Sequence, residues 1–190
     1  MFTVFLIPNI FFHKSNITAM EELKRKKLKV FLLSMFFCIS FTGNMYALDP
    51  GSKAPDFELQ GEQGPVKLSS TAGSVVYVDF WASWCGPCRQ SFSWMNAMQE
   101  KYRSQGLKII GVNLDGKNED ARKFLSQIPA HFTVAFDSKG VTPKIYGVKG
   151  MPTSFLIGRD GKVIFQHLGF KEADRENLEK QIKAAVEAKK

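Results

Sequence analysis

Two cysteines, Cys85 and Cys88, flank a Gly-Pro pair and are the residues of this chain best suited to chemistry. A disulfide across so short a loop constrains little chain entropy, so a structural staple explains them poorly. Zinc is a second explanation, but it needs two further ligands. Beyond residue 47 the sequence offers only His131 and His167, far apart in strand-like runs. The spacing therefore favours a reversible dithiol–disulfide pair, which acts as its own redox centre without a bound cofactor or metal.

The residues on either side of the pair predict the elements that position it. A β-branched and aromatic run at 74–81 is typical of a buried central strand, and it ends just before the cysteines. After Pro87, apolar residues recur at three- and four-residue steps over 88–101, the period of an amphipathic helix, with Gly106 as its stop. We therefore expect a strand, a short turn and a helix in that order.

This order gives the two cysteines different tasks. Cys85 lies at the start of the helix, where unpaired backbone amides and the helix dipole favour a thiolate, so we assign it as the nucleophile. Cys88, one turn inside the helix and less exposed, would attack the mixed disulfide that Cys85 forms and release the reduced partner. Gly86 and Pro87 complete the active-site turn, and proline is tolerated because a backbone N–H in the first helical turn has no partner to lose.

The remaining pattern predicts one α/β domain with a central mixed sheet flanked by helices. An apolar run at 107–114 follows the first helix and implies a βαβ crossover, hence parallel strands. An Asp-Gly pair at 160–161 is a strong signal for an antiparallel hairpin between the runs that flank it. The other expected elements are a hairpin from 56–59 and 66–68, a helix from 118 to about 127, strands over 132–136, 154–157 and 163–168, a short helix around 143–146, and a helix within 171–190.

The segment 78–88, Val-Asp-Phe-Trp-Ala-Ser-Trp-Cys-Gly-Pro-Cys, resembles the active-site segment of thioredoxins almost residue for residue. The segments 51–57 and 150–157 are similar to those of the exported TlpA/ResA-like branch of the thioredoxin superfamily. The likeness runs from about residue 51 to the C-terminus and implies a thioredoxin-like fold with an N-terminal β-hairpin extension. It also implies a periplasmic or otherwise extracytoplasmic protein disulfide reductase, recharged by a membrane thiol donor. In that branch apocytochrome c is a frequent substrate.

The same resemblance implies further site residues around the pair. Pro152 is expected to be cis, holding a loop beside the cysteines where Met151 offers backbone hydrogen bonds to a substrate peptide. Composition alone would favour an ordinary trans bond. Trp81 and Trp84 are each able to pack the core or cover the thiols, and Trp84 is the better site candidate because it adjoins the first cysteine. For Trp94, on the helix, packing in the core or on the surface and a role at the site are both left open.

Asp79 stands in the apolar strand, six residues before the first cysteine. Burial disfavours the charged form, so the pKa of a buried Asp79 is expected to rise; the alternative is an outward, solvated side chain. By resemblance to thioredoxin, a buried Asp79 would help to deprotonate Cys88 through water. ResA-like reductases usually carry a Glu three residues after the second cysteine and a Pro two beyond it, where this chain has Ser91 and Ser93. Because this chain lacks that Glu, a dedicated role in cytochrome c maturation is less expected. Asp79 is then the better candidate for the group that carries the proton.

Residues 1–47 are predicted to be a leader. A basic run at 24–29 precedes a mostly apolar stretch of 12 residues at 30–41, which is the layout of a signal peptide. A permanent membrane span takes roughly 20 apolar residues. We expect export with cleavage after Ala47 and a natural start at Met20, with an uncleaved leader that tethers the protein to the inner membrane as the alternative.

The thioredoxin-like domain is expected at 48–190, where the net charge is +4 and the basic residues form no block. Without a nucleic-acid motif, this modest excess indicates solvated surface, and nucleic-acid binding is not expected. The expected partners are protein substrates with disulfides, and the expected state is a monomer. Two rival functions stay open. One is a peroxidase of the same fold, indicated by the Ala-Pro-Asp-Phe start at 54–57 but lacking a lone peroxidatic cysteine; the other is a redox-inert binding or chaperone module.

Overall fold

Strand β3 (Val75–Trp81) is the centre of the fold and leads directly to the cysteines. Every one of its residues is buried. It pairs in parallel with β4 (Leu107–Asn113) and antiparallel with β6 (Thr153–Ile157). A strand with a neighbour on each side and packed side chains on both faces must be almost wholly apolar, which explains the unbroken run in the sequence.

The computed structural model describes residues 22, 24–27 and 48–188. The leader predicted for 1–47 lies outside these residues, apart from 22 and 24–27, which are helical. Nowhere in the described part of the chain is there a helix with the length and apolarity that a membrane crossing requires.

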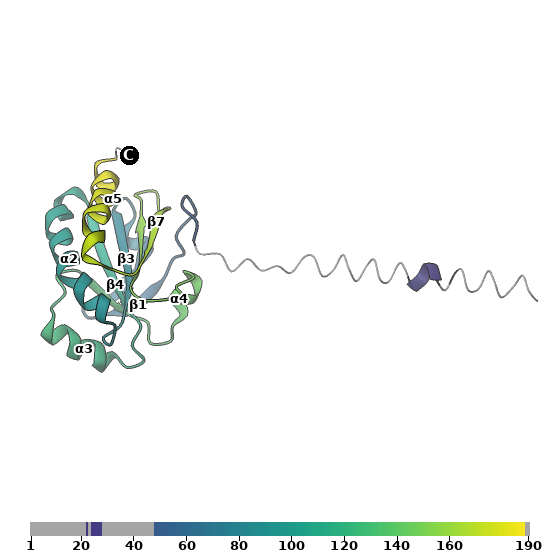
Figure 1. Ribbon diagram of the computed structural model, residues 1–190, viewed down its shortest axis with the longest axis horizontal. Helices are drawn as coiled ribbons and strands as arrows, with labels where there is room; N and C mark the ends of the chain where they lie inside the picture. Colours follow the sequence, from purple (N-terminus) through teal and green to yellow (C-terminus); the bar gives the residue numbers. More distant parts are fainter. Residues whose placement is uncertain (1–21, 23, 28–47, 189–190) are drawn as a thin grey trace, which may run out of the picture. The chain divides into compact units, whose positions relative to one another are not determined.

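The described residues form a mixed sheet of seven strands in the order β2-β1-β5-β4-β3-β6-β7 (Figure 1). Strands β3, β4 and β5 pair in parallel, whereas the pairings made by β1 and by β6 are antiparallel. This is the predicted central mixed sheet. The other elements are β1 (Glu58–Gly61), β2 (Gly64–Lys67), β5 (Thr133–Phe136), β7 (Val163–Leu168), α2 (Gly86–Tyr102), α3 (Asn118–Gln127), α4 (Val141–Ile145), α5 (Arg175–Glu187) and three 3-10 turns, η2 (Leu68–Thr71), η3 (Arg103–Gln105) and η4 (Glu172–Asp174).

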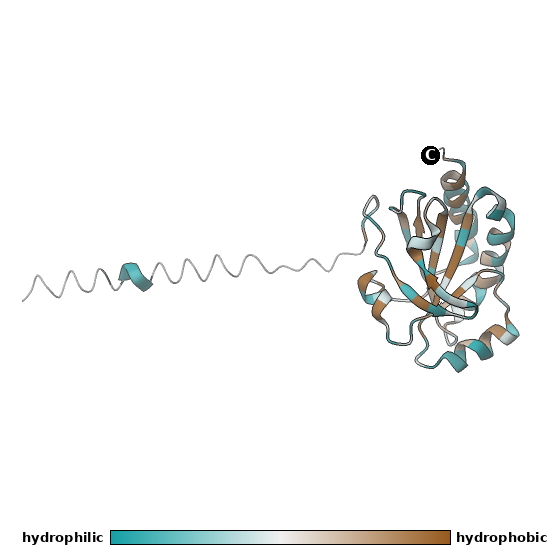
Figure 2. Ribbon diagram, turned by 180° about the vertical axis from the view of Figure 1, so that it is seen from behind, coloured by the Kyte–Doolittle hydropathy of each residue, from teal (hydrophilic) through white to brown (hydrophobic). Residues whose placement is uncertain are grey.

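Alternate residues of β3 feed two cores on opposite faces of the sheet. Tyr77 and Trp81 pack with apolar residues of α2, α3 and α5 on one face. Val78 and Phe80 pack on the other face with Tyr146, the residue that follows α4. In Figure 1, α2 and α5 cover one side of the sheet and α4 lies on the other. Figure 2 shows that hydrophobic residues are concentrated on the strands between these layers.

The predicted N-terminal hairpin is present and is part of the sheet itself. Strand β1 pairs with β2 and also with β5, where Gln60 lies opposite Phe136. Glycine is required at position 61 because a Cβ there would lie 2.8 Å from the carbonyl oxygen of Val134. The extension therefore lengthens the domain's own sheet.

Several predicted boundaries are wrong in detail. Helix α2 begins at Gly86, because Cys85 caps it and proline fits its first turn. Helix α5 begins at Arg175, after the turn η4. His131 lies in a bend before β5 and not in a strand, because its backbone N–H donates to the side-chain oxygen of Asn96 at 2.7 Å and ties this segment to α2.

Candidate functional site

The two cysteines lie at the N-terminus of α2 and form a disulfide, with their Cα atoms 5.3 Å apart. Cys85 is the N-cap residue, and its sulfur accepts a hydrogen bond from the backbone N–H of Cys88 at 3.3 Å. Both are buried, but Cys85 retains 6% exposure whereas Cys88 has none. As the sequence predicts, the cysteine at the start of the helix is the more exposed of the two.

The turn between the cysteines leaves the helix start open to solvent. Gly86 and Pro87 are both exposed and form the first residues of α2. Backbone amides in a first helical turn have no helical partners, and together with the helix dipole they favour negative charge at this point. A thiolate on Cys85 is therefore favoured by its position.

A polar clamp that the sequence analysis missed holds the turn before the cysteines. Asp115, just beyond the end of β4, accepts hydrogen bonds from the backbone N–H of Ser83 at 3.0 Å and from its hydroxyl at 3.0 Å. Asn113 donates to the same carboxylate at 2.8 Å. The sequence does carry a signal for this contact. Asp115 follows an apolar run that is predicted to be a parallel neighbour of β3, and the carboxyl ends of parallel strands lie at the same edge of a sheet. The clamp fixes the approach to Cys85.

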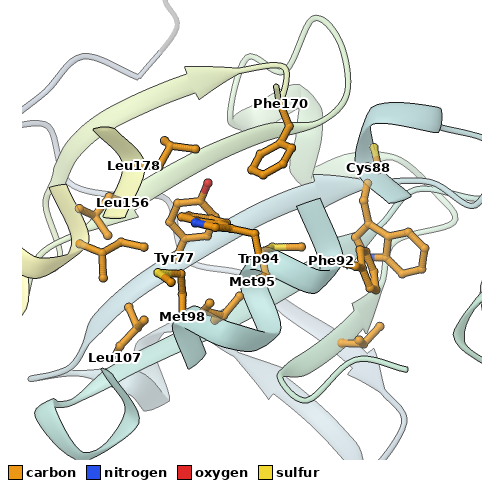
Figure 3. Close-up of a cluster of buried hydrophobic side chains, with 14 of the residues drawn as sticks. Tyr77, Cys88, Phe92, Trp94, Met95, Met98, Leu107, Leu156, Phe170 and Leu178 are labelled. Atoms are coloured by element: carbon orange, nitrogen blue, oxygen red, sulfur yellow. The ribbon is translucent and has the colours of Figure 1, made fainter. Parts of the chain in front are cut away.

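The three tryptophans differ in how far their side chains are exposed to solvent. Trp84, beside the nucleophile, is 73% exposed, whereas Trp81 is wholly buried and Trp94 is 5% exposed. Trp94 packs edge-on against Tyr77, with ring centroids 5.7 Å apart, and Figure 3 shows the two rings side by side in the core. Trp84 is therefore the tryptophan available to an approaching substrate, and the open question about Trp94 is resolved as core packing.

The loop before β6 lies at the same end of the sheet as the cysteines. The peptide bond between Met151 and Pro152 is cis, as the resemblance implied. Thr153, the first residue of β6, lies opposite Phe80 near the end of β3, and the backbone N–H of Gly169 donates to the Pro152 carbonyl at 2.7 Å. Met151 packs against the core cluster that contains both cysteines. The structure thus brings the predicted loop and the disulfide together.

Asp79 is buried, with 2% exposure, so the solvated alternative is wrong. Its Oδ2 atom is buried without a hydrogen-bond partner. Its neighbours in the sheet are Gly111 on β4, which has no side chain, and Ser154 on β6. Burial raises the pKa of the Asp79 carboxyl well above its ordinary value. Burial thus favours the protonated form of this carboxyl over the charged form.

Ser91 and Ser93 stand where ResA-like reductases usually carry Glu and Pro, and both form hydrogen bonds within their own helix. Ser91 is buried and donates its hydroxyl to the Cys88 carbonyl at 2.9 Å. Ser93 donates its hydroxyl to the Gln90 carbonyl at 3.3 Å on the exposed side of α2. Neither offers an acid to the cysteines. Among the described residues, no three His, Cys, Asp or Glu side chains are grouped in a way that would hold a metal ion.

Comparisons with known proteins agree with this geometry. A family model described as Redoxin matches residues 49–182. The chain belongs to the Redoxin family. Within it, the thiol-disulfide oxidoreductase ResA of Bacillus thuringiensis subsp. konkukian is 37% identical over 139 residues, covering 72% of this chain and 78% of the relative. ResA of Bacillus subtilis is 33% identical over 119 residues, covering 62% of this chain and 66% of the relative.

A solved structure extends the match. The crystal structure of a candidate thiol:disulfide interchange protein DsbE from Chlorobium tepidum is 68% identical, with a TM-score of 0.73, and covers 73% of this chain and 99% of that chain. This Redoxin-family chain is therefore a TlpA/ResA-like member of the thioredoxin superfamily with the predicted thioredoxin-like fold. It is a thiol-disulfide oxidoreductase, and disulfide-containing proteins are the substrates that this class implies.

Proposed function

We propose that this protein is an exported protein disulfide reductase that acts by dithiol–disulfide exchange at Cys85 and Cys88. The observation that carries the proposal is the pair itself: Cys85 caps α2 and retains 6% exposure, whereas Cys88, one turn inside, has none. The signal-peptide pattern of residues 1–47 supports export to the periplasm or another extracytoplasmic space. An uncleaved leader would instead tether the same domain to the inner membrane.

The exchange proceeds in two balanced steps. The Cys85 thiolate attacks one sulfur of the substrate disulfide, and the other substrate sulfur leaves as a thiolate that takes a proton from solvent. The ionised form of Asp79 then takes the proton of Cys88, and the Cys88 thiolate attacks the Cys85 sulfur. The Cys85–Cys88 bond forms, the bond to the substrate breaks, and the second substrate sulfur leaves as a thiolate that takes a proton from solvent. Two electrons have passed to the substrate, so a thiol donor at the membrane must reduce the pair again.

Substrate contacts are proposed for the surface around the pair. The exposed Trp84 offers an apolar wall beside the nucleophile. Met151 and Pro152, in the loop beside the cysteines, offer backbone groups along which an extended substrate segment would align. Ser91 and Ser93 leave this site without a helix acid, which supports a range of disulfide substrates over apocytochrome c alone.

The direction of electron flow and the rival functions are tested together. We expect a reduction potential near the roughly −270 mV of thioredoxin and far from the roughly −120 mV of a strong oxidant, measured by equilibration against glutathione. We also expect the purified domain to catalyse insulin reduction by a dithiol and to lose that activity in the Cys85→Ser variant. Rapid turnover of low peroxide would instead indicate a peroxidase. A redox-inert module would be favoured by the absence of disulfide exchange in the wild type, or by insulin reduction that survives loss of both cysteines.

A further inference from the structure

The outer edge of β4 has a strand partner over only part of its length. Strand β3 pairs with β4 throughout, whereas β5 pairs with it only over 110–113, so among the described residues no strand lies beside 107–109 on that edge. A side chain of α2 lies there instead. The backbone N–H of Ile109 donates to Oε1 of Gln99 at 2.7 Å, and Nε2 of Gln99 donates to the Leu107 carbonyl at 3.1 Å. The Gln99 amide thus makes the two hydrogen bonds that a residue of a neighbouring strand would make.

Strand β5 begins late because the segment before it is tied to α2. If β5 continued backwards in its present register, His131 would lie opposite Lys108. Asn96 of α2 instead accepts a hydrogen bond from the His131 backbone N–H at 2.7 Å and donates its side-chain amide to the Pro129 carbonyl at 2.9 Å. Asn96 and Gln99 are three residues apart, so they lie on the same side of the helix. One holds the chain away from β4, and the other occupies the place that is left.

A groove of about 1200 Å³ opens over this stretch of β4. The tip of the β1–β2 hairpin lines one side of it, and the segment between α3 and β5 lines the other. Apolar side chains reach it from both faces of the sheet, Val66 and Ile110 from one face and Leu125 and Phe132 from the other. The groove therefore offers an extended chain both backbone hydrogen-bonding groups and contacts for its alternating side chains.

The groove lies at the opposite end of the sheet from the cysteines. Leu107 pairs with Val75, the first residue of β3, whereas Cys85 follows the end of that strand. At roughly 3.3 Å per residue, the strand between them spans about 20 Å. A chain bound in the groove would therefore leave the disulfide accessible.

The charged side chains around the groove are mostly cationic. Glu62 is the one carboxylate among the described residues that line it, and it already pairs with Arg122 at 3.0 Å. Lys108 is exposed and forms no ion pair within the described part of the chain. The cations that line the groove are Lys67, Arg103, Lys108 and Arg122. The groove is thus complementary to a negatively charged ligand.

We propose that this groove binds an extended acidic segment of a partner protein, which displaces the Gln99 amide and adds a short strand to β4. Backbone groups of the segment replace the two hydrogen bonds of Gln99 one for one, so the displacement costs little. An apolar side chain of the segment would pack against Leu125 and Phe132. Its neighbours in sequence would lie on the other face of the sheet with Lys108, and there an Asp or Glu would meet the unpaired cation. This inference does not depend on the proposed exchange at the cysteines.

The test uses short synthetic peptides with blocked ends, and fluorescence anisotropy at low salt measures their binding to the purified protein. The probe alternates glutamate and valine. One control peptide has the same sequence but is N-methylated throughout, which removes its backbone donors and keeps its charge. The other replaces glutamate with lysine. We expect a Kd of roughly 10–100 µM for the probe, the scale of a small contact, and binding at least about tenfold weaker for both controls.

Two variants of the protein should shift the Kd of the probe in opposite directions. Gln99→Ala should tighten binding by about threefold to tenfold, because no amide has to be displaced. Lys108→Glu should weaken it by about fivefold to tenfold. Lys180→Glu is the matched control, because it makes the same change of charge on α5, outside the groove, and should bind as the wild type does. All three variants should reduce insulin at the wild-type rate, which separates this test from that of the proposed function.

Amide hydrogen exchange followed by NMR locates the bound peptide. The Ile109 N–H should exchange faster in Gln99→Ala than in the wild type, and the probe should protect it again. No binding at about 1 mM probe would overturn the proposal and show that Gln99 and Lys108 only protect an open strand edge. Equal binding of the N-methylated peptide, or an unchanged Kd in Lys108→Glu, would overturn it as well. A dimer that the probe dissociates would make a second copy of this chain the occupant, in place of a partner protein.

Discussion

The sulfur of Cys85 accepts a hydrogen bond from the backbone N–H of Cys88, so the first cysteine caps the helix that carries the second. In the reduced protein the same amide points at a sulfur that holds negative charge more readily than an ordinary thiol does. The asymmetry between the two residues is thus a property of one helix terminus. Attack by one cysteine and resolution by the other follow from it.

Alkylation rates should reveal this asymmetry directly. In the reduced protein, we expect iodoacetamide to modify Cys85 faster than Cys88 by about tenfold or more, because only Cys85 is both accessible and at the helix start. Mass spectrometry of timed samples measures the two rates. In denaturant the two residues should react alike, which is the control. Equal rates in the folded protein would contradict the assignment of the nucleophile.

Replacing Asp79 with Asn should stabilise the protein at neutral and higher pH. The pKa of the buried carboxyl is raised, so the folded state holds a proton that the unfolded chain releases above about pH 4. Stability is therefore lost as pH rises through the raised pKa. We expect a gain of about 1–3 kcal/mol at pH 8, the scale of an unsatisfied buried polar group. Urea unfolding measures it.

Two comparisons check the source of that gain. It should shrink as pH falls and vanish at about pH 2–3, below the ordinary pKa of Asp, where both folded and unfolded wild-type chains carry the proton. Asp160→Asn, on the exposed turn between β6 and β7, should leave stability within about 0.5 kcal/mol of the wild type at either pH. A gain in Asp79→Asn that does not depend on pH would show that the charge of the carboxylate is not its cause.

Arg159 in the same turn should be more important to stability than its surface position indicates. Its guanidinium donates to the carbonyls of Gly73 at 3.0 Å, Gln105 at 2.8 Å and Val186 at 3.0 Å, joining the entrances of β3 and β4 to the end of α5. Arg159→Ala is expected to lower the free energy of unfolding by about 2–3 kcal/mol, because hydrogen bonds from a charged donor are lost. Lys162→Ala, an exposed neighbour, should change it by less than about 0.5 kcal/mol. Equal effects would show that the three hydrogen bonds contribute little.

Local pattern was enough to predict the centre of this fold and the redox pair. The apolar run of β3, the helical period of α2 and the Asp-Gly turn each act over a few residues, so their signals survive in a single sequence. The cysteine spacing predicts a redox pair by the same local reasoning. Burial of Asp79 also followed, since both of its neighbours in the strand are apolar.

Features that depend on contacts across strands could not be predicted in this way. The Ser83–Asp115 clamp joins residues 32 positions apart, and the Tyr77–Ser154 hydrogen bond joins residues 77 apart. Both depend on strand register, which a one-residue slip would change. The same holds for the pairing of β1 with β5. Trp81 and Trp84 differ in exposure for a local reason, since Trp81 lies in strand β3 and Trp84 in the turn after it.

Capture of the mixed disulfide tests most directly that Cys85 attacks the substrate and Cys88 resolves the adduct. Reduced Cys88→Ser protein is mixed with insulin, quenched with an alkylating agent and analysed by intact mass and peptide mapping. We expect a covalent adduct of the protein with an insulin chain through Cys85, because the resolving sulfur is gone, and no adduct in Cys85→Ser. An adduct through Cys88 in the Cys85→Ser protein, or none in either variant, would contradict the assigned exchange.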